Sequence, residues 1–215
     1  MKNLRKLSEL PPLKSYPERH EMILKDLARN VERFLNDILH GLPRIDRVSA
    51  RAKSPDSYIN KSLKKQPDGE LKYENPLDQI QDQVGARVVV LYSDDVEVVS
   101  RKVTSTLTKI EEKRLVPESE YEFGYFGKHF VFFLPEDVKN DDWSDEDIPT
   151  FFELQIKTLY QHAWSEASHD LAYKAGNDLT SNQKRRFAFT AAQSWGADEI
   201  FSALFNDLDS TETDS

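Results

Sequence analysis

The sequence predicts a single domain of the mixed α/β or α+β class, in which strands alternate with helices. Two observations predict this class. Short runs rich in β-branched and aromatic residues alternate with longer amphipathic segments, and helical patterns lie toward both ends of the 215-residue chain. The runs that we expect to form strands cover residues 44–51, 86–93, 129–135 and 150–157.

The helices are predicted from apolar spacing and from start and stop signals. Apolar side chains recur at helical spacing across residues 15–42, and Gly41 and Pro43 end that pattern. Ser54 and Pro55 are typical of the N-cap and first turn of a helix over 54–65. Further helices are expected over residues 75–84, 94–110, 157–174 and 181–208.

Composition excludes several classes of protein. No apolar stretch approaches the length that spans a bilayer, and the first residues lack the continuous apolar segment of a secretory signal. The chain has no cysteine, which excludes disulfides and thiolate metal sites. We therefore expect a cytoplasmic protein that does not contact a membrane.

The net charge of −9 is unevenly distributed along the chain. Acidic residues concentrate in 136–147 and 207–215, whereas residues 1–75 carry sixteen basic and eleven acidic side chains. Acidic runs of this kind are usually solvated loops and tails. The N-terminal third can therefore accept a phosphate-bearing partner.

The stretch RAKSPDSYINK places four polar donors where a strand meets a helix. Arg51 and Lys53 share one face of the strand because side chains alternate, and Ser57 and Lys61 share one face of the helix. Helix N-termini also favour anions. The four residues predict a cradle for a triphosphate, although an ordinary basic surface patch would have the same spacing.

Two stretches supply carboxylates next to the central strands. Asp82 precedes the 86–93 run and Arg87 lies inside it, which fits either a structural ion pair or an arginine that stacks on a planar ligand. Glu153 and Gln155 point to one face of the 150–157 strand, where a buried glutamate needs a cation or donors. Asp82 and Glu153 on adjacent strands would suit Mg²⁺.

The predicted helix 157–174 carries His162, Glu166 and His169 at positions i, i+4 and i+7. This spacing puts the three side chains on one face and could hold a transition metal. No fourth ligand is evident in the sequence. We favour the interpretation that these residues line the edge of a pocket.

Taken in order, these motifs resemble the synthetase domain of the RelA/SpoT family in its small stand-alone form. The resemblance covers about residues 51–174 and includes G-Y-x₃-H in the stretch EYEFGYFGKHF and E-x-Q-I-K-T in the last strand. It implies a nucleotidyltransferase-like fold with a mixed sheet of about five strands. The implied organisation is an N-terminal helical extension (1–42), a synthetase domain (43–176) and a C-terminal helix with an acidic tail (177–215).

The resemblance implies an ATP-dependent pyrophosphokinase that transfers the β,γ-diphosphate of ATP to the 3′-hydroxyl of GDP or GTP, with Mg²⁺ as cofactor. Asp82 and Glu153 would be the catalytic residues and the metal ligands. The implied ATP-binding residues are Arg51, Lys53, Ser57, Lys61 and Arg87, with the two arginines on either side of the adenine. The implied acceptor-binding residues are Tyr125, His129, Gln155, His162 and His169, and Lys128, the one new cation of the loop, is added to them.

The acceptor loop departs from the family pattern P-K-x-N-G-Y. The lysine and asparagine of that pattern are absent and Glu122 and Phe123 directly precede Gly124, so the loop has few cations for the 5′-phosphates of a free nucleotide. An alternative is therefore a toxin-like member that modifies the 3′-terminal adenosine of tRNA and needs a neutralising partner. A second alternative is a non-catalytic nucleotide-binding module. The aromatic C-terminal helix could assemble a homo-oligomer, but we favour packing of its rings onto the chain's own sheet.

Overall fold

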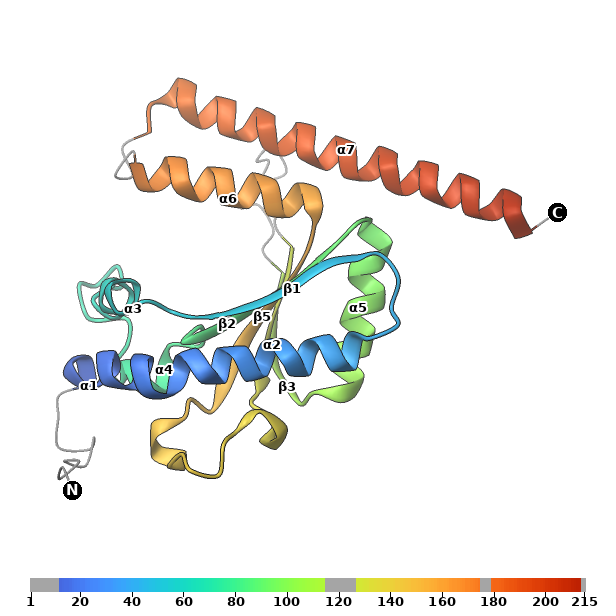
Figure 1. Cartoon of the computed structure of the whole chain (residues 1–215). Coiled ribbons are helices and arrows are strands. Elements are labelled where there is room, and N and C mark those ends of the chain that lie inside the picture. Colours follow the sequence, from blue (N-terminus) through green and yellow to red (C-terminus); the bar gives the residue numbers. More distant parts are fainter. Residues whose placement is uncertain (1–11, 115–126, 175–178, 214–215) are drawn as a thin grey trace.

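The computed structural model of the chain describes residues 12–114, 127–174 and 179–213 (Figure 1). Its centre is a five-stranded sheet in the order β1-β2-β5-β4-β3. β2 and β5 run parallel and the other three pairs are antiparallel. The strands are β1 (Ile45–Ala52), β2 (Val84–Val90), β3 (Lys109–Arg114), β4 (Lys128–Phe133) and β5 (Phe151–Thr158). The predicted α+β class and strand number are confirmed.

One face of the sheet forms the hydrophobic core with α2 (Lys25–Leu39) and α5 (Ser93–Thr106). Alternate residues of the central strands, such as Val88 and Leu154, point to this face and are fully buried. The apolar stripe of α2 packs onto them, and Leu27 in that stripe is likewise fully buried. Residues 25–39 thus share one core with the sheet.

Two long helices, α6 (Leu159–Lys174) and α7 (Ser181–Thr213), lie beside one another at one end of the sheet (Figure 1). α7 is tied to the sheet by a hydrogen bond between the hydroxyl of Thr158 and the carboxylate of Asp198. The connection anchors α6, which begins immediately after β5.

Short helices cover the other end of the sheet. They are α1 (Pro12–Arg19), the π-helical turn η2 (His20–Leu24), α3 (Pro55–Ser62) and α4 (Pro76–Gln79). The acidic connection between β4 and β5 contains the 3₁₀ turns η3 (Glu136–Val138) and η4 (Asp145–Asp147). Across the described residues, no helix combines the length and the apolarity needed to cross a membrane.

Two predicted helices and one strand differ most from the structure. The helix expected over 75–84 is the single turn α4, because Val84 already pairs with Ala52 as the first residue of β2. The helix expected over 94–110 ends at Thr106, and β3 follows it. β3 was not predicted because the sequence KIEEKR has five charged residues and only one apolar residue, a pattern tolerated at a sheet edge.

Candidate functional site

A pocket of about 550 Å³ lies on the face of the sheet opposite α2 and is bordered by β1, α3, β2, β5 and α6. Eight residues predicted from the sequence line it: Arg51, Lys53, Ser57, Asp82, Arg87, Glu153, Gln155 and His162. The lining also includes Glu166, which the sequence placed at the edge of a pocket, and Arg47 and Ser49, which were not among the predicted site residues.

Strand register arranges the pocket floor in two adjacent rows. The first row contains Ser49, Arg87, Gln155 and His129, from β1, β2, β5 and β4. The second row contains Arg51, Gly85, Glu153 and Val131. Side chains two residues apart on a strand point to the same face, so both rows face the pocket side of the sheet. Gly85 contributes no side chain to the pocket floor between Arg51 and Glu153.

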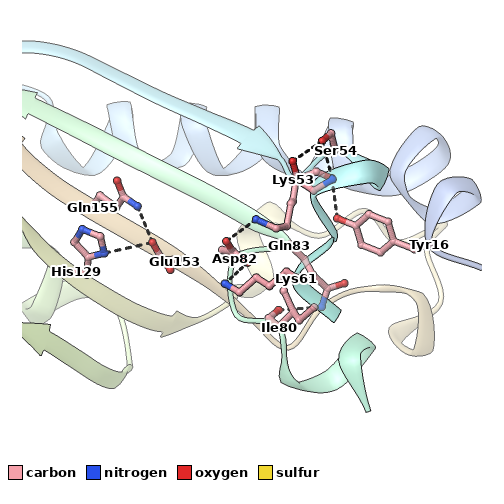
Figure 2. A network of polar contacts seen from close by, with 11 residues as sticks. Tyr16, Lys53, Ser54, Lys61, Ile80, Asp82, Gln83, His129, Glu153 and Gln155 are labelled. Atoms are coloured by element: carbon pink, nitrogen blue, oxygen red, sulfur yellow. Dashed lines mark hydrogen bonds and ion pairs between the residues drawn. The ribbon is translucent and has the colours of Figure 1, made fainter. Parts of the chain in front are cut away.

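The predicted phosphate cradle is formed where β1 passes into α3 (Figure 2). The hydroxyl of Ser54 accepts the backbone N–H of Ser57 and caps α3. Lys53 donates to Oδ2 of Asp82 at 2.8 Å, and Nζ of Lys61 lies 3.0 Å from Oδ1. That second oxygen is buried and accepts no well-directed hydrogen bond. The carboxylate of Asp82 therefore pairs with two lysines, one directly after β1 and the other in α3.

Glu153 is held in its charged form at the centre of the floor (Figure 2). Gln155 donates to Oε1 of Glu153 at 2.7 Å, and Nδ1 of His129 lies 3.5 Å from the same oxygen. Burial alone would raise the pKa of Glu153, but the hydrogen bonds from these two neighbours outweigh it and lower the pKa to about 2. The imidazole Nε2 of His129 is buried without a partner.

Arg87 does not pair with Asp82, the structural alternative that the sequence left open. Its guanidinium lies 2.5 Å from Oε1 of Glu166, 2.9 Å from Nδ1 of His162 and 3.2 Å from Oε1 of Gln155. Burial and the charge of Arg87 lower the pKa of His162, so this imidazole is neutral at pH 7 and accepts from the arginine. The i, i+4 spacing of His162 and Glu166 was the available signal for this contact.

Three predicted acceptor residues lie elsewhere or outside the described residues. Lys128 belongs to the helix-covered face of the sheet, where it pairs with Glu97 of α5 at 2.6 Å. His169 is exposed on α6 and does not line the pocket. Tyr125 falls in residues 115–126, which lie outside the described part of the chain. Of the predicted acceptor set, His129, Gln155 and His162 are brought together beside Glu153 and Arg87.

Lys157 is a buried cation next to this site that the sequence did not single out. It is 5% exposed, shares the face of Glu153 and donates to the hydroxyl of Ser165 at 3.0 Å. Burial and the charge of Arg87 lower its pKa to about 8. Gly127 packs directly over the Lys157 side chain.

Replacing Lys157 by methionine is expected to stabilise the fold at pH 7 by roughly 1–3 kcal/mol. The pKa of Lys157 in the folded state lies below the ordinary value of 10.5. The destabilising effect of its ammonium is therefore present in full below about pH 8. Between pH 8 and 10.5 the unfolded chain binds more protons, and stability should rise with pH. Urea unfolding at pH 7, 9 and 10 should reveal this rise in the wild type and its loss in Lys157→Met; equal slopes would contradict the assignment.

The sequence profile described as "Region found in RelA / SpoT proteins" matches residues 50–178, well over half of the chain. The chain belongs to the RelA/SpoT family. The match begins within β1 and ends just past α6, so it includes every pocket-lining residue except Arg47 and Ser49, which precede it on β1.

The chain shares about a quarter of its aligned residues with two named relatives. The chain is 26% identical to GTP pyrophosphokinase YwaC of Bacillus subtilis over 148 residues, which cover 66% of this chain and 65% of YwaC. It is 24% identical to GTP pyrophosphokinase YjbM of the same organism over 165 residues, 74% of this chain and 72% of YjbM. Its fold matches small alarmone synthetase 1 of B. subtilis with a TM-score of 0.69 at 17% identity, covering 92% and 97% of the two chains.

Proposed function

We propose that this chain is an ATP-dependent pyrophosphokinase that transfers the β,γ-diphosphate of ATP to the 3′-hydroxyl of GDP or GTP. The observation that carries the proposal is one pocket that Arg51, Lys53, Asp82, Arg87 and Glu153 line together, with Lys61 of α3 paired to Asp82 beside it. The family membership and the names of YwaC and YjbM, both GTP pyrophosphokinases, point to the same reaction. Since its substrates are cytoplasmic nucleotides, we place the enzyme in the cytoplasm.

In this proposal the donor triphosphate lies over the β1–α3 junction. Lys53 and Lys61 are already held beside the pocket by Asp82, so their ammonium groups need little reordering to meet phosphate oxygens. Ser57 adds a hydroxyl on the first turn of α3. Arg51 and Arg87, on adjacent strands of the floor, are the candidates to stack on the adenine.

The two carboxylates fit a Mg²⁺ site that is completed by the substrate. No group of three or more ligating side chains is present in the described ranges, but Mg²⁺ commonly uses one or two carboxylates together with substrate phosphates. The buried Oδ1 of Asp82 has no hydrogen bond, and Glu153 is charged at any physiological pH. Asp82 and Glu153 would hold the ion, which neutralises charge on the phosphates when bound.

The proposed transfer forms a bond between the acceptor 3′-oxygen and the β-phosphorus and breaks the bond between that phosphorus and the oxygen bridging to the α-phosphate, so AMP leaves. The 3′-hydroxyl proton passes to solvent water. A pKa of about 2 makes Glu153 a weak base in the free protein, so its charge is better suited to binding cations than to taking that proton. In this proposal the acceptor lies beside His129, Gln155 and His162, which surround Glu153 and Arg87.

Incubating the full chain with Mg²⁺, γ-labelled ATP and separately GDP, GTP, ATP or bulk tRNA tests the proposal. We expect label in the guanosine nucleotide and one AMP for each labelled product. Label at the 3′ end of tRNA would instead support the toxin-like alternative. ATP binding without AMP release under any acceptor would support the non-catalytic module and overturn the proposal.

A further inference from the structure

Tyr16 connects the N-terminal helix α1, which lies outside the family match, to the phosphate cradle. Its side chain is completely buried, and its hydroxyl donates a 2.9 Å hydrogen bond to the backbone carbonyl of Lys53 (Figure 2). Burial raises the pKa of Tyr16, so the hydroxyl remains protonated and able to donate. The contact spans 37 residues of sequence.

Lys53 needs such a contact because it lies one residue beyond the end of β1. Its backbone N–H donates to the carbonyl of Gln83 at 2.9 Å, while its carbonyl accepts from Tyr16. Its ammonium reaches Asp82 at 2.8 Å. Both main-chain polar groups are therefore held by segments distant in sequence, and the side chain starts from a defined point toward the carboxylate.

A second tyrosine provides an internal comparison. The ring of Tyr58 on α3 stacks on that of Tyr16 with centroids 3.7 Å apart and planes 4° apart, and both side chains are completely buried. The two tyrosines differ in the hydrogen bonding of their hydroxyl groups. The hydroxyl of Tyr16 is bonded to Lys53, whereas that of Tyr58 has no hydrogen-bond partner.

We propose that Tyr16 is a positioning residue for the donor site: through the carbonyl of Lys53 it sets the place from which the Lys53 ammonium reaches the ATP phosphates. The proposal deepens the proposed function and rests on it. It assigns the N-terminal segment a part in nucleotide binding, since Tyr16 reaches a main-chain atom of the cradle itself.

The test is the affinity of the full chain for Mg²⁺ with α,β-methylene ATP, whose α–β bridge cannot be cleaved, measured by titration calorimetry. Tyr16→Phe removes only the hydroxyl and is expected to weaken this binding by about three- to tenfold, the usual effect of one hydrogen bond. Tyr58→Phe makes the same change in the stacked partner and should bind as the wild type does. Affinity for the acceptor nucleotide should be unchanged in both variants.

A double-mutant cycle with Lys53→Met separates positioning from general destabilisation. If Tyr16 acts through the Lys53 ammonium, Tyr16→Phe should have no further effect on analogue affinity once that ammonium is gone. Its effect on urea stability should persist, because the Lys53 carbonyl remains in Lys53→Met. Unchanged affinity in Tyr16→Phe, an equal loss in Tyr58→Phe, or an undiminished loss in the Lys53→Met background would overturn the proposal.

Failure of this inference and failure of the proposed function give different results. A wild-type chain that binds the analogue but labels no guanosine nucleotide overturns the function alone, because the cycle is read from binding. A wild-type chain that does not bind the analogue overturns both.

Discussion

Replacing Glu153 by glutamine is expected to reduce diphosphate transfer by about two to three orders of magnitude, the size of effect seen when a preorganised charge is removed from a site. The substitution keeps the size of the side chain and removes the negative charge that would bind the cation. Glu153 lies in the same row of the pocket floor as Arg51, next to the row that contains Arg87, Gln155 and His129. Initial rates of AMP release at saturating ATP and GDP would measure the loss.

Folding of the Glu153→Gln variant should persist, since the side chains of Gln155 and His129 are only partly buried and can rearrange around an amide. Glu111→Gln is a suitable control, because Glu111 lies on the same sheet face on edge strand β3 and is 41% exposed. We expect this control to retain wild-type turnover. Near-normal transfer by Glu153→Gln would remove Glu153 from the mechanism.

Replacing Gly127 by alanine is expected to destabilise the fold by about 3 kcal/mol, near the upper end of the range for overpacking. A Cβ at this position would overlap the backbone carbonyl oxygen of Ile156 and lie 2.5 Å from Cγ of Lys157. The lysine stem can move, but the oxygen belongs to the central strand β5. Urea unfolding at pH 7 would measure the change.

Displacement of Gly127 should also shift His129, two residues later on β4, away from Glu153. We therefore expect the KM for the acceptor to rise more than the KM for ATP in Gly127→Ala. Gly196→Ala is the matched control, because Gly196 lies within α7 with nothing near its Cβ position. Alanine should stabilise that helix slightly. Equal stability of Gly127→Ala and Gly196→Ala would contradict the packing assigned to Gly127.

The sequence alone determined the fold class and most of the pocket. The strands β1, β2, β4 and β5 were predictable because their apolar residues are buried in a pattern that local spacing reveals. Alternation along β5 also placed Glu153 and Gln155 on one face before any contact was known. The motifs, taken in their order along the chain, therefore predicted eight residues that line one pocket.

Local pattern could not reveal contacts between distant residues. Arg87 needed a partner, but Glu166 became that partner only because α6 crosses the pocket side of β2. Lys128 was grouped with the acceptor residues as a cation of the loop, yet strand alternation turns it toward Glu97 on the opposite face. β3 was not predicted because an exposed charged edge strand lacks an apolar period.

The stretch GYFGKHF shows both what the sequence alone determines and what requires the tertiary structure. Its residue types and order indicated the family, since a glycine-tyrosine-histidine pattern can be recognised without coordinates. Only the tertiary structure decided why Gly127 cannot carry a side chain, and how Tyr16 comes to hold Lys53. The physical reason is the same in both cases: local sequence sets backbone preference and the direction of each side chain, whereas the packing of distant segments sets which groups meet.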